Sequence, residues 1–294
     1  MIGSFTPVVI ALAVAGGAPS SSASAGAAKV EVWRASPSSP RVVLAPNADA
    51  PDAALRVVFL AGAADDLLEE GLTRLSQYAL LHGQARAPYT SLDAAVYGAD
   101  GTLSVETSVR ECSFTFVAPN AHGAGAFDDV AAKLLSQVLA PKVDAAGVER
   151  ARRLATTDLL EAGSQQWLEA FVAADVLVTE GVDGGGDYNN PIWGDPDVLR
   201  RISAASVQKH IAGKLAPANA IVVATGRFDV ARLQREVAQL TGGKERAFHR
   251  PDIMPALPLS RVHDGPREVH LQVQVVDVTD AKSAALVHVL TAAL

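Results

Sequence analysis

The stretch that decides the fold is Gly-Leu-Thr-Arg-Leu-Ser-Gln-Tyr-Ala-Leu-Leu-His-Gly, residues 71–83. A helix is predicted from Leu67 to His82, because acidic residues stand near its start and a glycine, the residue that most often follows a helix end, comes directly after it. Upstream, Leu55–Ala61 is an apolar run that predicts a β-strand, and it ends at the turn-forming residues 62–66. The predicted order is therefore strand, acidic turn, helix.

The spacing inside residues 71–83 is that of a zinc-binding helix. In such a helix two histidines share one face and grip the metal, while a glutamate between them takes a proton from the metal-bound water. This chain has Arg74, Gln77 and Tyr78 at those three positions. A guanidinium has no lone pair to donate, a carboxamide is no general base near neutral pH, and phenol is a poor zinc ligand beside imidazole. These positions are predicted neither to bind zinc nor to activate water.

The composition is that of an ordinary globular protein. The chain has 294 residues, of which 49% are hydrophobic and 19% charged, enough to bury roughly three quarters of the unfolded surface. Its net charge is −7 and its lysines and arginines form no run, which argues against a nucleic acid or an anionic membrane as partner. The single cysteine, Cys112, excludes an internal disulfide and is expected to be a structural thiol.

Residues 1–28 carry no charged side chain. An apolar run from Pro7 to Ala15 precedes the small residues Ala23-Ser24-Ala25, a pattern that resembles a signal peptide and predicts a periplasmic or secreted protein. The alternatives are a disordered leader on a cytoplasmic protein, or a start codon placed too late. No other segment reaches the roughly 18 apolar residues that a membrane span needs.

Further elements follow from apolar periodicity. Strands are predicted at residues 30–34, 41–44, 103–109, 113–117 and 220–225, and helices at 127–139, 144–162, 164–179, 197–201, 204–215 and 230–240. The first two strands, and likewise the next two, are separated by turn-forming residues and are predicted to pair as antiparallel hairpins. The fold class is therefore predicted to be α+β, a mostly antiparallel sheet packed against helices, with one domain over residues 29–243.

The composition changes after that domain. Residues 244–266 hold four prolines and mixed charges, which indicates an extended linker. Residues 267–294 then repeat the order strand, acidic turn, helix, and are predicted to open a second copy of the first unit. Because such a copy needs far more residues, the chain is expected to be a fragment or a natural half-protein. The alternative is a C-terminal helix that docks back on the first unit.

Four segments in collinear order resemble the insulinase and mitochondrial processing peptidase family of zinc metallopeptidases, over about residues 30–294. The family's Gly-Ser-x-Asp-Glu strand end resembles residues 62–66, and its Gly-Leu-Ala-His-Phe-Leu-Glu-His-Met-Leu-Phe-Lys-Gly helix resembles residues 71–83. Its Pro-Tyr-Gly-Arg-Pro-Val-Leu-Gly-Thr-Pro-Glu-x-Leu segment is similar to residues 187–199, and its Pro-x-Asn-Ala strand to residues 217–229. Their succession, rather than any one string, carries the resemblance, which implies a processing-peptidase-like half-unit.

The resemblance also implies a third zinc ligand, a glutamate that closes a Glu-Arg-x-x-x-x-x-Glu helix. Glu149-Arg150 fits the start of that string, and Thr156 then stands at the ligand position, in a register that is open by a few residues. The nearest acids are Asp158 and Glu161. One carboxylate without imidazole partners cannot build a zinc site, so this helix is interpreted as a charged helix that faces solvent.

The histidines offer no replacement site. They are His82, His122, His210, His249, His263, His270 and His288. No two fall three or four residues apart, so no hidden metal-binding helix is expected. His82 lies beside the altered positions but would need Tyr78 or Gln77 as its partner ligand, and it is not expected to bind metal.

Three hypotheses about function follow from the resemblance. In the first, the chain is a catalytically inactive homologue without a zinc cofactor, which acts as partner or peptide-binding subunit of an active processing-type peptidase; an extended peptide is then held by an exposed strand edge. In the second, it is a zinc-dependent endopeptidase with non-standard or partner-supplied ligands. In the third, it is a structural subunit of a larger assembly.

Overall fold

The computed structural model of the chain describes residues 30–83, 91–120, 123–163 and 192–246. In these ranges six strands form one sheet in the order β1-β2-β6-β3-β5-β4. The strands are β1 (Glu31–Trp33), β2 (Arg41–Pro46), β3 (Asp52–Phe59), β4 (Thr102–Thr107), β5 (Cys112–Pro119) and β6 (Ala220–Gly226). Every neighbouring pair is antiparallel except β2 with β6. The predicted mostly antiparallel sheet and both predicted hairpins are confirmed.

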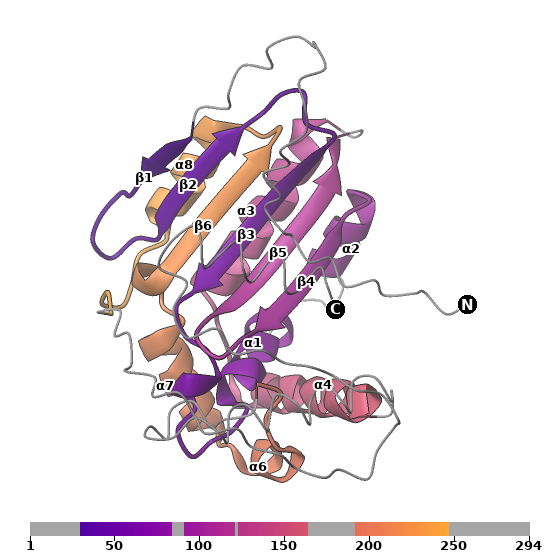
Figure 1. The fold of residues 1–294 in the computed structure, drawn as a ribbon, viewed down its shortest axis with the longest axis vertical. Coiled ribbons are helices and arrows are strands. Elements are labelled where there is room, and N and C mark those ends of the chain that lie inside the picture. Colours follow the sequence, from indigo (N-terminus) through magenta and orange to yellow (C-terminus); the bar gives the residue numbers. More distant parts are fainter. Residues whose placement is uncertain (1–29, 84–90, 121–122, 164–191, 247–294) are drawn as a thin grey trace, which may run out of the picture.

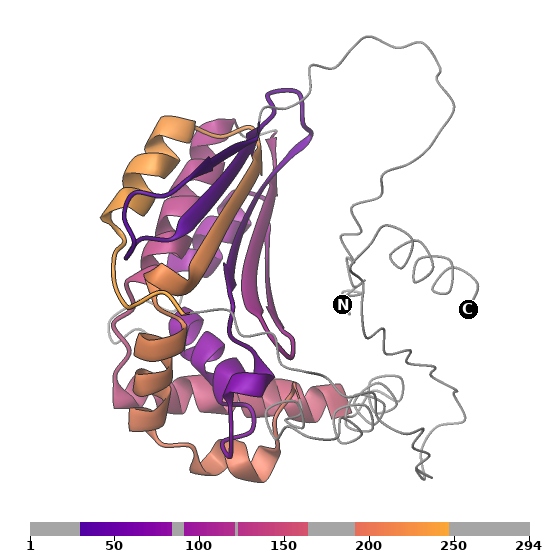
Figure 2. The ribbon, with the colours of Figure 1, turned by 60° about the vertical axis from the view of Figure 1, so that its left-hand side comes forward.

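Helices cover one face and one end of this sheet. Within the described ranges they are α1 (Leu72–His82), α2 (Ser91–Gly98), α3 (Ala124–Leu139), α4 (Ala145–Gly163), α6 (Pro196–Arg201), α7 (Ala204–Lys214) and α8 (Val230–Gln239). Helices α2, α3 and α8 lie along one face of the sheet, whereas α1, α4, α6 and α7 gather at its end (Figures 1 and 2). The predicted α+β class is confirmed.

The core lies between the sheet and the helices on its face. Strand β3 shows why, because its side chains alternate between the two faces and Leu55, Val57 and Phe59 are fully buried while the residues between them are half-buried. Phe116 of the neighbouring strand β5 stacks on Phe127 of α3, with ring centroids 5.4 Å apart. Such aromatic and aliphatic contacts fix α3 across the sheet.

Two elements differ from the sequence predictions. Helix α1 begins at Leu72 and not at Leu67, because Gly71 has a φ of +87°, a left-handed conformation that a continuing helix cannot contain. Helix α2 was not predicted, since its eight residues give too short an apolar pattern to distinguish a helix from a loop. The predicted leader 1–28, the helix 164–179 and the second repeat 267–294 lie outside the described residues.

No helix in the described part of the chain combines the length and apolar character that a bilayer crossing requires. Cys112, the first residue of β5, is buried, and burial raises the pKa of its thiol above the usual value. A thiol that stays protonated inside the core is a packing residue, as the sequence predicts.

Candidate functional site

The motif helix α1 starts where two glycines touch. Gly71 and Gly194 both have positive φ, of +87° and +75°, and a side chain on Gly194 would place its Cβ 2.6 Å from the Gly71 Cα. Only glycine allows this approach without displacing the backbone. The contact brings Trp193, the residue before Gly194, to the same end of α1 as Arg74.

Gln77 stands at the position of the general base and is completely engaged. Its side chain is 0% exposed. The amide nitrogen donates to the carbonyl oxygens of Glu106 on β4 (3.1 Å) and Ser113 on β5 (3.2 Å), and the amide oxygen accepts from the Thr107 hydroxyl. A carboxamide has one acceptor group and one nitrogen with two donors, and all of them are used here. Gln77 therefore ties α1 to two strands.

Tyr78 stands at the position of the second histidine and connects α1 with α4. Its hydroxyl donates to the Asp158 carboxylate and accepts from Nη2 of Arg74 at 3.3 Å. Burial raises the pKa of Tyr78 to about 12, against the opposing charge of Arg74. The phenol thus keeps its proton near neutral pH, and that proton is held by Asp158.

Arg74 stands at the position of the first histidine. Its side chain is 9% exposed, and its guanidinium carbon lies 4.1 Å from the ring centroid of Trp193 and 5.4 Å from that of Tyr78. These distances are within the range of cation–π attraction, which is strongest for tryptophan. Arg74, Tyr78 and Asp158 form a bonded chain from α1 to α4.

Thr156, the residue that the resemblance places at the third ligand position, is half-buried on α4. The acid that meets Tyr78 is Asp158, two residues further along. Two residues correspond to about 200° around a helix, so the two side chains leave α4 in different directions. The register of the third position stays a prediction, and Asp158 is the second candidate for it.

His82 lies one turn after Tyr78, with ring centroids 6.1 Å apart. Burial lowers the pKa of His82, against the charges of Asp93 and Asp158. It is the only histidine near these positions in the described part of the chain. His122, His249, His263, His270 and His288 lie outside the described residues, and His210 belongs to a different cluster.

These residues do not fit a zinc ion. The amide of Gln77 already makes three hydrogen bonds, and the hydroxyl of Tyr78 donates its proton to Asp158. The positive charge of the Arg74 guanidinium would repel a metal cation. Among the described residues, no three histidine, cysteine, aspartate or glutamate side chains gather closely enough to hold a metal.

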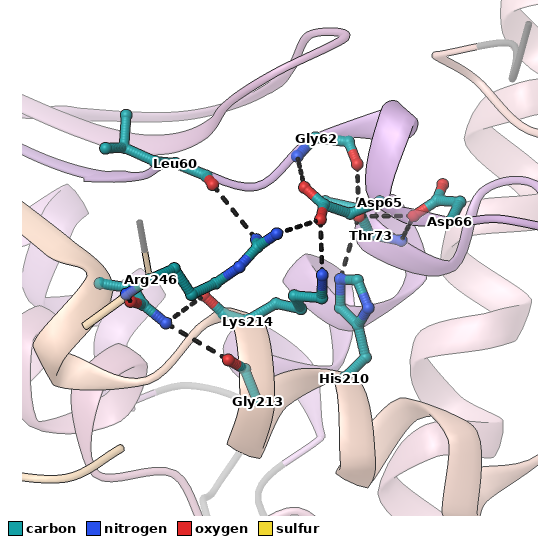
Figure 3. Close-up of polar contacts among 10 residues, drawn as sticks. Leu60, Gly62, Asp65, Asp66, Thr73, His210, Gly213, Lys214 and Arg246 are labelled. Atoms are coloured by element: carbon teal, nitrogen blue, oxygen red, sulfur yellow. Dashed lines mark hydrogen bonds and ion pairs between the residues drawn. The ribbon is translucent and has the colours of Figure 1, made fainter. Parts of the chain in front are cut away.

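A second polar cluster fixes the beginning of α1 (Figure 3). Asp66 is 2% exposed and accepts from the backbone N–H groups of Gly71 (3.0 Å) and Thr73 (2.8 Å), which caps the helix. The Thr73 hydroxyl lies 2.5 Å from the Asp66 carboxyl and 3.0 Å from Nε2 of His210 on α7. Burial raises the pKa of Asp66 to about 7 and lowers that of His210 to about 4.

The neighbouring carboxylate, Asp65, joins α7 and the end of the described chain to the same turn. It accepts from Lys214 at 2.7 Å and from Arg246 at 2.8 Å. Burial opposes its ionisation, but these two bonds outweigh it and lower the pKa of Asp65. Sequence reasoning missed the roles of Asp65 and Asp66. The only sequence sign was a pair of acids in the turn that precedes the predicted helix.

Comparisons with known proteins find the fold rather than a close relative. No family model and no curated protein matches the sequence. Among solved structures, pitrilysin matches with a TM-score of 0.64 and 14% identity over 79% of this chain and 25% of pitrilysin. The periplasmic protease PqqL from Escherichia coli matches with a TM-score of 0.63 and 13% identity, over 77% of this chain and 25% of PqqL.

A peptidase M16 inactive domain from Pseudomonas fluorescens matches with a TM-score of 0.61 and 17% identity, over 76% of this chain and 54% of that one. The chain thus spans about half of this relative and a quarter of the two proteases. Similarity at such low identity concerns the fold, and the fold is the one that the sequence resemblance implied. The chain has the fold of an M16 peptidase half-unit, the insulinase-like architecture.

Proposed function

We propose that this chain is a catalytically inactive M16 homologue that acts as a peptide-binding partner subunit of an active processing-type peptidase. The observation that carries the proposal is the state of Arg74, Gln77 and Tyr78. Gln77 and Tyr78 are held in bonds with the protein itself, and Arg74 carries a guanidinium that has no lone pair for a metal, so we expect the three positions to supply neither metal ligands nor a base.

The sheet edge beside these positions supports peptide binding. Among the described residues, strand β4 is the last strand of the sheet and pairs only with β5. Gln77 bonds to the Glu106 carbonyl near the end of β4, so the edge runs up to the motif helix. An extended peptide can add to such an edge by main-chain hydrogen bonds, which requires no metal.

Contacts near the last described residues indicate how far the first domain extends. Glu245 pairs with Arg34, and the Arg246 backbone N–H bonds to Asn219. We therefore place the end of the first domain after Arg246, with the proline-rich linker beginning there and the second repeat at 267–294. Export to the periplasm, supported by residues 1–28, is part of the same proposal.

The test uses the purified chain alone. We expect it to bind labelled unstructured peptides in the presence of a chelator, to leave them uncleaved, and to hold far less than one zinc per chain by elemental analysis. Stoichiometric zinc together with chelator-sensitive cleavage would contradict the proposal and favour the alternative, an endopeptidase with unusual ligands. An active M16 peptidase recovered with the chain from its native host would support the partner role, and an unrelated assembly would favour the structural alternative.

A further inference from the structure

Arg74 carries a charge that no carboxylate in the described residues neutralises directly. Its Nε is buried without a hydrogen-bond partner. Its bond to Tyr78 is long, at 3.3 Å, and goes to a hydroxyl that carries no charge. The nearest acid in this chain of bonds, Asp158, is separated from the guanidinium by the tyrosine hydroxyl. A buried guanidinium without an anion is costly, and a bound carboxylate would offset that cost.

The aromatic neighbours contact the face of the Arg74 guanidinium and leave N–H groups in its plane for this anion. The Trp193 ring centroid lies 4.1 Å from the guanidinium carbon, so the indole attracts the cation through its ring face. The N–H groups of a guanidinium point outward in its plane, where two of them match the two oxygens of a carboxylate. Lysine offers no such fork.

Arg74 lies close in the fold to the strand edge that we propose binds a peptide, so the anion can be part of that peptide. Arg74 lies three residues before Gln77 on α1, about 4.5 Å along the helix axis. Gln77 in turn bonds to the end of the edge strand β4. Arg74 therefore lies within one helical turn of the residue that holds the end of this edge strand.

We propose that Arg74 binds a carboxylate of the peptide ligand, with Trp193 holding the guanidinium in place. This inference rests on the proposed peptide-binding function and adds the chemistry of the ligand. The carboxylate belongs either to the C-terminus of the peptide or to an acidic side chain near it. In both cases the ligand binds to Arg74, at the helix position where a zinc-binding helix has its first histidine.

The test is fluorescence anisotropy with three labelled peptides of one sequence: a free C-terminal acid, its C-terminal amide, and the amide with one glutamate near the end. We expect the wild-type chain to bind at least one of the two peptides that carry a carboxylate about tenfold more tightly than the plain amide. Equal tightness for the third peptide and the acid identifies an acidic side chain as sufficient, whereas a preference for the acid alone identifies the C-terminus.

The variant Arg74→Met should remove the preference for a carboxylate, and Arg74→Lys should restore only part of it. Arg200→Met is the matched control, because Arg200 is an exposed arginine on α6 that pairs with Asp197. Wild-type chain that binds all three peptides equally overturns this inference and leaves the proposed function standing. A preference that survives in a folded Arg74→Met variant also overturns it. Failure of every peptide to bind contradicts both. The wild-type comparison decides the question even where a variant does not fold.

Discussion

At the scale of single residues, the hydroxyl of Thr73 contacts two buried groups, Asp66 and His210, whose pKa values are shifted in opposite directions. It lies within bonding distance of the Asp66 carboxyl, the His210 ring and the Gly62 carbonyl. One hydroxyl has one proton to donate and can accept two. The Thr73 hydroxyl donates its proton to the Asp66 carboxyl or to the Gly62 carbonyl, and it can accept from the His210 ring when Nε2 carries a proton. The two buried titratable groups therefore share one hydroxyl.

This arrangement predicts two opposing effects of pH on the free energy of unfolding. The pKa of Asp66 rises from 3.8 to about 7, so the stability present below pH 3.8 is lost as the pH rises toward 7. The pKa of His210 falls from 6.5 to about 4, so the stability present above pH 6.5 is lost as the pH falls toward 4. Between about pH 4 and 6.5 the two proton balances cancel.

Single variants should separate these effects. In urea unfolding between pH 4.5 and 7, Asp66→Asn should gain stability as the pH rises, and His210→Gln should lose it, each by up to roughly 3 kcal/mol. Asp49→Asn removes an exposed carboxylate and should follow the wild-type profile. Parallel profiles for the two variants would show that Asp66 and His210 are not linked in this way.

Gln77 gives the second prediction at this scale. In Gln77→Glu an ionised carboxylate would face the carbonyls of Glu106 and Ser113, to which the amide now donates. We expect a loss of about 3 kcal/mol or more near pH 7.5 and a smaller loss near pH 5, where the carboxyl can keep its proton. Urea unfolding at both pH values checks this.

Gln208→Glu is the control, because Gln208 is an exposed glutamine that also donates to a carbonyl, that of Val143. It should cost less than about 1 kcal/mol at either pH. If both variants cost the same, the bonds of Gln77 do not stabilise the fold, and the position would be free to hold a base.

The sequence was sufficient to single out Arg74, Gln77 and Tyr78 and to predict that they bind no zinc, because ligand chemistry belongs to the side chain itself. It was not sufficient to find their partners. Asp158 and Trp193 are far away along the chain and reach α1 only through tertiary packing. For the same reason, nothing in the local sequence showed that Asp66 is buried against α7.

At the scale of elements, α1 and α4 are joined by the Tyr78–Asp158 bond, which gives a prediction about the third zinc position. Replacing Arg74→His, Gln77→Glu and Tyr78→His restores the zinc motif on α1. With Asp158→Glu added, we expect about one zinc per chain by elemental analysis, because position 158 faces position 78. With Thr156→Glu added instead, we expect much weaker binding. The reverse ranking would support the register in which Thr156 is the ligand position.

Elements were predicted best where a pattern is long or strongly apolar. Strand β6 and helix α3 were found within a few residues of their true ends. Helix α2 was missed because its buried residues, Leu92 and Val96, span a single turn. The start of α1 was misplaced because it is set by the conformation of Gly71 and by the cap from Asp66. Neither of these leaves a periodic pattern in the sequence.

At the scale of the whole molecule, the bonds of Glu245 and Arg246 predict where the first domain ends. A chain that stops after Arg246 should retain the free energy of unfolding of the full chain within about 1 kcal/mol. A chain that stops at residue 243 loses the ion pairs to Arg34, Arg41 and Asp65. It should unfold at a lower urea concentration than the chain that stops after Arg246. Urea unfolding of both truncations checks this, and equal stabilities would return the boundary to residue 243.

The place of β6 in the sheet has a consequence for biosynthesis. Strand β6 lies between β2 and β3, although it is made last of the three. While the ribosome synthesises the residues between Phe59 and Ala220, the two earlier strands lack the partner that will separate them. At usual elongation rates this lasts on the order of ten seconds. Until Gly226 has been added, the edges of β2 and β3 that β6 will cover stay unpaired, and unpaired strand edges are where a nascent chain is prone to aggregate.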